Sequence, residues 1–413
     1  MKEDYKVLRN LATKKREIVE MFNNDRNIRL WKDTNDLKSN LAPVQIYQVP
    51  WHEINHEQLA LKCKNKYLRE IEDGIRKEIY TMQHFPCNMI FKNEIMCEAV
   101  VYDSDFGLKE RSKTISPEKG SRALARQFKP SIRGPEDIKK LKQPEIYYDE
   151  KLTMRRFAVL KDIFDGRLEV RLTGKRGYWF TPWDNLVRYT GVEQMMIDLI
   201  ERPEYIEELV NHFVQLSLFR LKTYNELNVW GSNNNNVSVG SGGYGYTHDL
   251  KEEERNNIGT STKEMWGCGN AQVFSEVSEQ MHWDFSLKYE IKWLENFGLN
   301  YYGCCEQLHN KIGILEKIPN LRKISMSPWA DLKKAVEVID NRYVLSIKPN
   351  PSYLAMDAFD DDVIKKEIND ILDKSENSSK EIILKDISTV KHQPERIDRW
   401  AAIVMEEIKN RYN

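Results

Sequence analysis

The sequence predicts an α/β protein, a (β/α)8 TIM barrel with a helical N-terminal extension. Stretches of strand pattern and helix pattern alternate from residue 150 to the C-terminus, which is typical of parallel strands. The number of right-handed strand–helix–strand crossovers that this alternation requires favours a closed barrel over an open sheet. A doubly wound sheet would carry a glycine-rich phosphate turn after its first strand, whereas the glycine run 240–245 lies mid-chain with no helix directly after it.

Hydrophobic periodicity and turn residues set the expected elements. We expect one domain over residues 1–413, with residues 1–40 as helix outside the barrel. The expected strands are 44–49, 168–173, 237–239, 299–304, 321–326, 343–347 and 381–385, with further β pattern over 88–101. The expected helices are 57–81, 150–163, 192–200, 203–227, 279–297, 309–317, 331–339, 360–374 and 394–411. Residues 103–148 are rich in loops and basic side chains, which predicts either a mobile lid over the barrel mouth or a solvated insertion.

Composition narrows the class of protein. Hydrophobic residues make up 40% and charged residues 31% of 413, enough apolar material for one large core. The 63 Lys and Arg balance the 64 Asp and Glu, so no electrostatic footprint for nucleic acid is present. No apolar stretch approaches the roughly 20 residues of a membrane span, and the first thirty residues lack a signal-peptide pattern. We therefore expect a cytoplasmic protein whose six cysteines are mostly reduced.

Polar residues follow the expected strands, where a (β/α) barrel holds its active site. Cys304, Cys305 and Glu306 follow one strand, and Asp386 follows the last. Thiolates and carboxylates bind zinc, and a catalytic zinc takes three protein ligands and keeps one open position. Adjacent cysteines on a strand point to opposite faces, so both reach one metal only if the strand has ended. The alternative is that one thiol packs inside the barrel and the other against a helix.

Other candidates accompany this group. Asp386 is a ligand or a general acid or base, or else a helix cap or a salt-bridge partner of Lys385 or Arg396. His309 and His248 are candidate proton donors, with structural roles as the alternative. Aromatic and amide side chains at strand ends are typical of a pocket for a flat ligand, or of rim packing. Those considered as substrate-binding residues are Trp266, Tyr246, Asn270 and Trp329.

Several motifs resemble a known family. The stretches Tyr-Tyr-Gly-Cys-Cys-Glu-Gln-Leu-His at 301–309, 318–329 and 343–351 resemble the uroporphyrinogen-decarboxylase superfamily. The stretches 245–250, 266–272, 277–281 and 385–390 resemble its branch of corrinoid-dependent methyltransferases of anaerobic O-demethylation. The resemblance covers residues 165–413 well and is loose over the first 160 residues, where only 43–51 fits.

The resemblance implies a (β/α)8 barrel that moves a methyl group from a small methylated substrate, an aryl methyl ether, to the Co(I) corrinoid (cobalamin) of a partner protein. Family members hold zinc on a His-x-Cys pair and a cysteine of the last strand. This chain has no such histidine and carries Asp386 at the last strand, so a zinc would have a different ligand set, Cys304 and Cys305 with Asp386 or, alternatively, Glu306. His309, His248 and Glu306 are then the catalytic candidates. A homodimer is compatible with this reading. The alternatives are a decarboxylase or lyase acting on a carboxylated ring, a methyltransferase from corrinoid to tetrahydrofolate, and a non-catalytic binding barrel.

Overall fold

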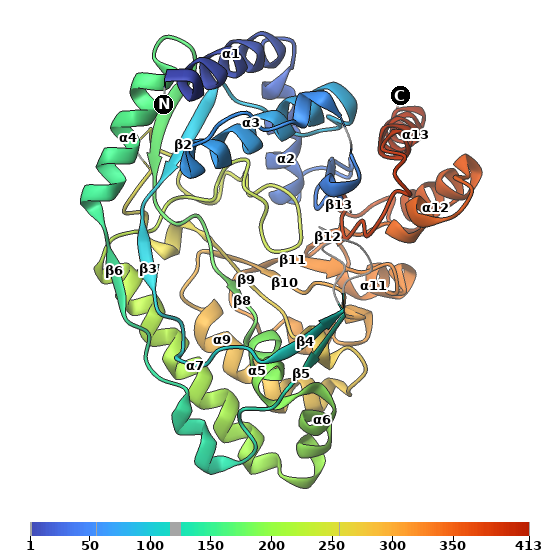
Figure 1. Cartoon of the computed structure of the whole chain (residues 1–413). Coiled ribbons are helices and arrows are strands. Elements are labelled where there is room, and N and C mark those ends of the chain that lie inside the picture. Colours follow the sequence, from blue (N-terminus) through green and yellow to red (C-terminus); the bar gives the residue numbers. More distant parts are fainter. Residues whose placement is uncertain (1, 55, 116–124, 256, 413) are drawn as a thin grey trace.

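The central sheet of the computed structural model is parallel throughout, which confirms the predicted α/β architecture (Figure 1). The structure describes residues 2–412 apart from 55, 116–124 and 256. Seven strands form this sheet, in the order β1 (Val44–Ile46), β13 (Lys380–Leu384), β12 (Val344–Ile347), β11 (Leu321–Met326), β10 (Leu299–Tyr302), β9 (Trp266–Gly269) and β8 (Trp179–Phe180). Parallel neighbours in one sheet bring their carboxyl ends to the same edge, which positions the site described below.

The predicted closure into an eight-stranded barrel is not detected. Within the described residues no ladder joins the edge strands β1 and β8, and β2 (Glu94–Glu98) pairs with β7 (Glu169–Thr173) in a separate parallel sheet. The strand expected over 237–239 is also absent, since Ser238 makes only an isolated bridge to Tyr244. Asparagine and glycine fill this region and have low strand propensity. Asn234 Nδ2 instead donates to three backbone oxygens, those of Thr247, Leu250 and Lys251.

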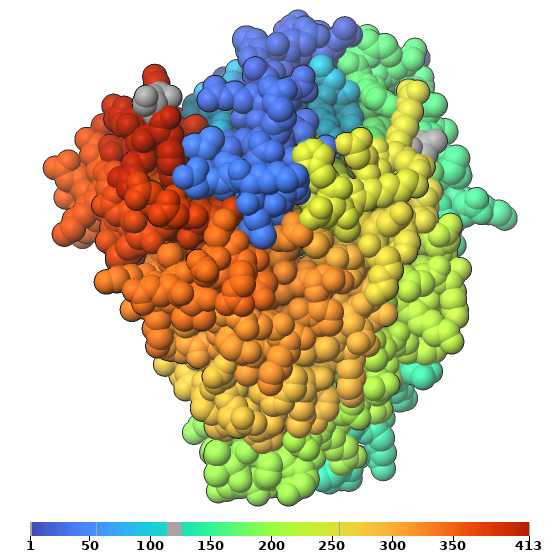
Figure 2. All heavy atoms as spheres, turned by 180° about the vertical axis from the view of Figure 1, so that it is seen from behind, coloured from blue at the N-terminus to red at the C-terminus, as the bar shows by residue number. Residues whose placement is uncertain are grey.

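Of the predicted helical segment 1–40, the structure shows two helices, within residues 2–35. The first four helices are α1 (Lys2–Val19), α2 (Asn24–Asn35), α3 (Lys66–His84) and α4 (Glu150–Phe164), grouped at one end of the molecule (Figure 1). Leu8, Ile79, Ile163 and Leu168 belong to a hydrophobic cluster that α1, α3 and α4 share with β2 and β7. The N-terminal and C-terminal segments lie side by side on the back of the molecule (Figure 2), where the Tyr412 hydroxyl donates to Asn40 O at 3.2 Å.

The remaining helices pack around the main core. They are α5 (Pro182–Thr190), α6 (Val192–Glu201), α7 (Pro203–Glu226), α8 (Glu279–His282), α9 (Lys288–Leu294), α10 (Ile312–Leu315), α11 (Leu332–Ile339), α12 (Asp361–Lys374) and α13 (Glu395–Tyr412). The helix expected over 279–297 ends at Leu294 and contains a π-helical turn, Trp283–Leu287, between α8 and α9. Trp183, Trp293 and Trp400 are completely buried in this core. None of the helices that the structure describes is both long and apolar enough to cross a bilayer.

The predicted lid is anchored at both ends. β3 (Val101–Asp103) pairs with β6 (Ile146–Tyr148), and β4 (Ser112–Ile115) pairs with β5 (Ala125–Phe128), both antiparallel. Phe106, Ile132 and Leu141 are buried in the main core, where the Phe106 ring packs 4.6 Å from that of Phe213 in α7. The central part of the lid, 116–124, lies outside the described residues. The mobility of residues 103–148 therefore stays a prediction.

Candidate functional site

Two thiols leave the sheet together at the end of β10. Gly303 has φ +103°, and a Cβ there would lie 2.4 Å from Leu308 Cδ1, so this turn requires glycine. The Ser325 hydroxyl of β11 holds the next residue by donating to Cys304 O at 2.6 Å. Because the ladder has ended, the sulfur atoms of Cys304 and Cys305 lie on one side, 3.7 Å apart. The two sulfur atoms therefore lie at one site, and their predicted role as metal ligands stays a prediction.

The end of β13 supplies the other half of the site. Asp386 has φ +57°, and its N–H donates to Gln48 Oε1 at 3.1 Å. Cys305 Sγ lies 3.8 Å from Asp386 Oδ2. The buried Lys385 Nζ bridges Cys304 Sγ at 3.4 Å and Asp386 Oδ2 at 2.7 Å. We call Cys304, Cys305, Lys385 and Asp386 the thiol–lysine cluster.

Electrostatics in the cluster make one thiol acidic and its neighbour a donor. The hydrogen bond from the Cys305 thiol and the nearby Lys385 ammonium outweigh burial and lower the pKa of Cys304 to about 6. The same bond and burial raise the pKa of Cys305. Burial lowers the pKa of Lys385, but the negative charges of Cys304 and Asp386 raise it by more, so the net shift of its pKa is upward. At neutral pH the cluster then holds a thiolate on Cys304, a thiol on Cys305 and an ammonium on Lys385.

The thiolate absorbance of the protein should titrate with a midpoint near pH 6, and this titration should be missing in Cys304→Ser. Below that pH the sulfur is protonated, and above it the absorbance is fully present. Burial raises the pKa of Cys268 to about 12, so that thiol stays silent in this range and Cys268→Ser serves as the matched control. An unchanged titration in Cys304→Ser would assign the acidic thiol to another residue.

The cluster offers only part of the donor set that a catalytic zinc needs. Two thiolates on one tetrahedral zinc, with Zn–S of about 2.3 Å, have sulfur atoms roughly 3.8 Å apart, and Cys304 and Cys305 match this. Among the described residues, however, no three His, Cys, Asp or Glu side chains are grouped to hold a metal ion. The Lys385 ammonium already bridges Cys304 and Asp386. The arrangement does not fit a three-ligand zinc, which stays a prediction.

A second buried lysine lies inside the sheet beneath the cluster. Lys348 follows β12, and its ammonium donates to the Tyr301 hydroxyl at 2.7 Å and to the hydroxyls of Ser325 and Ser346 at 2.9 Å. Burial lowers the pKa of Lys348 to about 7. Sequence reasoning did not select Lys348 as a site residue, and it named Lys385 only as a possible salt-bridge partner of Asp386, an ion pair that the structure contains. The available signal was a lysine directly after an apolar strand of a parallel sheet, where its ammonium must be buried.

Glu306 lies behind the cluster rather than in it. Its carboxylate is fully buried and accepts the backbone N–H groups of Cys304, at 2.5 Å, and Ala271, at 3.0 Å. These bonds tie the end of β10 to the end of β9. Burial raises the pKa of Glu306 to about 7. Although Glu306 was predicted as a catalytic residue, these contacts are those of a residue that positions the Cys304 turn.

The two candidate histidines are not brought to the cluster. His248 Nδ1 lies 2.5 Å from Asp36 Oδ2, and the adjacent Asp249 pairs with Arg322 near the start of β11, which is the amino end of the sheet. His309 follows the Cys304 turn, but its charged neighbours are Lys334 and Asp331 of α11 and its cap. Burial lowers the pKa of His309. The described contacts of both histidines lie with these other residues, so the candidate proton donors beside the thiols are Lys385 and Cys305.

The four predicted substrate-binding residues divide between the two ends of the sheet. Trp266 begins β9 at the amino end and donates to Gly245 O, and Tyr246 is buried beside Lys92, 5.7 Å from its ring centre. Asn270 follows β9 at the carboxyl end and accepts the Trp179 indole N–H at 2.8 Å. Trp329 follows β11 at the same end and is 65% exposed. Only Asn270 and Trp329 share the end that holds the thiols.

A buried acid lies on the far side of β10. Glu290 of α9 accepts the hydroxyls of Tyr302, at 2.7 Å, and Ser286, and Tyr302 also contacts His282 Nε2 at 2.9 Å. Burial raises the pKa of Glu290 from 4.5 to about 7. The folded state then binds more protons than the unfolded state between these values, so stability falls as pH rises from about 4.5 through about 7.

Glu290→Gln should flatten this slope. A pKa shift from 4.5 to about 7 is worth on the order of 3 kcal/mol. The free energy of unfolding of the variant minus that of wild type should therefore be a few kcal/mol larger at pH 8 than at pH 5. The measurement is urea unfolding at both pH values, with the partly exposed Glu207→Gln as control. Parallel stability curves for wild type and Glu290→Gln would contradict the raised pKa.

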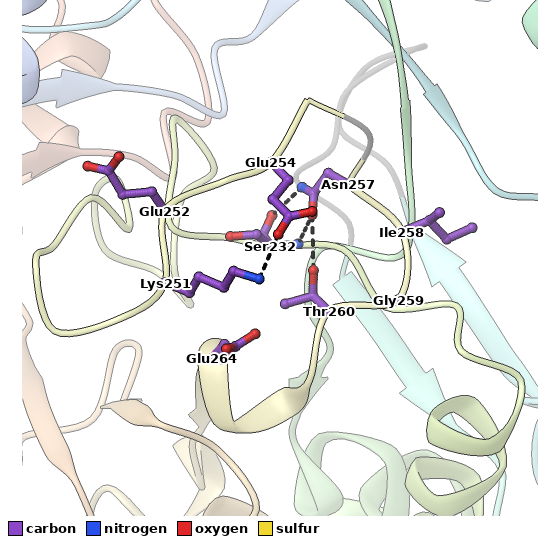
Figure 3. Close-up of a pocket in the computed structure, with 9 residues that line it drawn as sticks. All are labelled: Ser232, Lys251, Glu252, Glu254, Asn257, Ile258, Gly259, Thr260 and Glu264. Atoms are coloured by element: carbon purple, nitrogen blue, oxygen red, sulfur yellow. Dashed lines mark hydrogen bonds and ion pairs between the residues drawn. The ribbon is translucent and has the colours of Figure 1, made fainter.

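Two pockets lie outside the thiol–lysine cluster. A small one on the loop side is lined by Lys251, Glu254, Asn257 and Ser232 among others (Figure 3), and its side chains mainly hold the loop together. Asn257 Oδ1 accepts Ser232 N–H at 2.6 Å, and Lys251 pairs with Glu254. The other, a cavity of about 360 Å³ between β8, β9 and residues 237–240, is taken up below.

The comparisons with known proteins are sparse. No protein-family model matches the chain, and no curated protein matches it. Among solved structures, a methyltransferase from Methanosarcina mazei is similar over 74% of this chain and 77% of its own, with 12% sequence identity and a TM-score of 0.41. A likeness of this size does not bear on the chemistry of the site.

Proposed function

We propose that the chain is a methyltransferase that moves a methyl group from a small methylated substrate, an aryl methyl ether, to the Co(I) corrinoid of a partner protein. The observation that carries the proposal is the thiol–lysine cluster at the carboxyl ends of β10 and β13. In parallel α/β proteins this edge is where catalytic groups gather. The motif resemblance at 301–309 and 385–390 supports the same assignment.

The chemistry needs help at the leaving group. An aryl ether oxygen is a poor leaving group, so charge on the departing phenolate must be stabilised as the C–O bond breaks. Lys385 is charged at neutral pH, and its neighbours hold its ammonium in place. In the proposed step the C–O electron pair stays on oxygen, and Lys385 Nζ donates a hydrogen bond or its proton there. When the partner is bound, its Co(I) corrinoid supplies the electron pair that takes up the methyl group.

The exposure of the cluster supports access by a partner. The Asp386 side chain is half exposed and Cys305 partly so, whereas Lys385 is buried. Trp329 and Met356, at the carboxyl ends of β11 and β12, are large apolar side chains open to solvent. A partner domain would cover such side chains as its corrinoid approaches the cluster.

The experiment combines purified chain, a reduced corrinoid protein and a panel of O-, N- and S-methyl donors. The optical spectrum of Co(I) should change with an aryl methyl ether only when the chain is present. Failure with every donor would overturn the proposal. Release of CO2 from a carboxylated ring would favour the decarboxylase alternative, and methylation of tetrahydrofolate from methylated corrinoid would favour the other methyltransferase.

The zinc prediction is tested in the same preparation by metal analysis of wild type, Cys304→Ala and Cys305→Ala. Zinc in wild type that is lost from both variants would support it. Fully active wild-type protein without zinc, prepared with zinc available, would end it and leave the ammonium of Lys385 as the stabilising charge.

A further inference from the structure

A cavity of about 360 Å³ lies at the edge where the sheet does not close. Its walls are the ends of β2 and β7, the strands β8 and β9, and residues 237–240. Gly240 of this lining packs directly on the Tyr301 ring, since a Cβ there would lie 2.4 Å from it. None of the four residues of the thiol–lysine cluster is among those that line it. The cavity is of the size that small organic ligands occupy.

Two cationic side chains face this cavity against one acid. The Lys175 ammonium lies 5.7 Å from the centre of the Tyr178 ring, and no side-chain hydrogen bond or ion pair of the described residues engages it. Arg176 Nη2 donates to Glu98 at 2.9 Å, but the buried Arg176 Nε has no partner among the described residues. Glu98 is 62% exposed and turns toward solvent. The lining therefore keeps an excess of positive charge.

The rest of the lining is aromatic. Trp179 is 38% exposed, while Trp266 is buried in the wall. Tyr178 is half-buried beside them and packs 5.2 Å from Trp293. Flat apolar walls favour a planar ring, and an ammonium and a guanidinium in the same lining favour a carboxylate.

We infer that this cavity binds a small aromatic carboxylate, with its ring against Trp179 and Trp266 and its carboxylate on Lys175 and Arg176. The inference goes beyond the proposed function, because none of the four residues of the thiol–lysine cluster lines this cavity. Its failure would leave methyl transfer at the thiol–lysine cluster untouched.

The test is calorimetric titration of the full chain with benzoate, benzamide and acetate. Benzoate should bind, and benzamide and acetate should each bind about 10-fold more weakly or worse, because one lacks the charge and the other lacks the ring. Lys175→Met and Arg176→Gln should each weaken benzoate by about 10- to 100-fold. Lys222→Met and Arg167→Gln, on exposed and partly exposed positions away from the lining, should bind benzoate as wild type does.

Benzoate that fails to bind wild type, that binds no better than benzamide, or that keeps its affinity in both cavity variants would overturn the inference. Acetate as tight as benzoate would overturn the aromatic part. If Lys175→Met does not fold, the comparison of the three ligands on wild type and the Arg176→Gln variant still decide the outcome.

Discussion

Lys385→Met should lower the rate of methyl transfer by about 100- to 1000-fold, which is the usual cost of removing one donor that stabilises a developing oxyanion. The Lys385 ammonium is the cation that contacts both Cys304 and Asp386. Methionine is one atom shorter than lysine but keeps an unbranched apolar stem of similar shape, so the wall of the site stays packed. The measurement is the initial rate of Co(I) consumption with an aryl methyl ether and saturating corrinoid protein.

Three comparisons sharpen this prediction. Lys391→Met removes a lysine that pairs with Asp357 at the surface and should leave the rate unchanged. Lys385→Arg keeps the charge and should recover part of the rate. Circular dichroism and unfolding midpoints should show that Lys385→Met is folded. A folded Lys385→Met enzyme with more than half of the wild-type rate would remove Lys385 from the mechanism.

Strand and helix positions in the C-terminal half could be predicted from the sequence because local pattern determines them. The strands over 321–326 and 343–347 were placed to within a residue, and the helix over 203–227 begins at Pro203 as its first-turn proline indicated. β8 and β9 were missed because they are short and lie among glycines and tryptophans. Their pairing is fixed by long-range contacts, which a local pattern does not contain.

The sequence was enough to predict which edge of the sheet holds the site. Knowing that parallel strands end together was enough to join Cys304, Cys305 and Asp386 across 82 residues of chain, counted from 304 to 386. It was not enough to place His248, which depends on how the loop 229–255 folds back to the amino end. Lys348 was missed for another reason, since periodicity alone treats a lysine as a surface residue.

Buried charge inside the sheet also sets the stability of the chain. Lys323 and Glu381 are both completely buried, 2.8 Å apart, on β11 and β13. Glu381 also accepts the Ser346 hydroxyl at 2.6 Å and the Gly243 N–H at 2.8 Å. Burial raises the pKa of Glu381, but Lys323 and these hydrogen bonds outweigh it, so the net shift is downward. The carboxylate is therefore ionised at neutral pH, and it compensates the Lys323 ammonium.

Glu381→Gln should lower the free energy of unfolding by about 3 to 5 kcal/mol, because it leaves the Lys323 ammonium buried without a counter-charge. The amide oxygen of glutamine can still accept from Gly243, so the loss reports charge more than hydrogen bonding. The double variant Lys323→Met with Glu381→Gln should recover most of the loss, since it removes both charges. Asp370→Asn breaks the exposed pair with Lys374 and should cost less than about 1 kcal/mol. Urea unfolding at pH 7 measures all four proteins. A Glu381→Gln variant no less stable than Asp370→Asn would mean that the Lys323 ammonium is neutral or solvated in the folded chain.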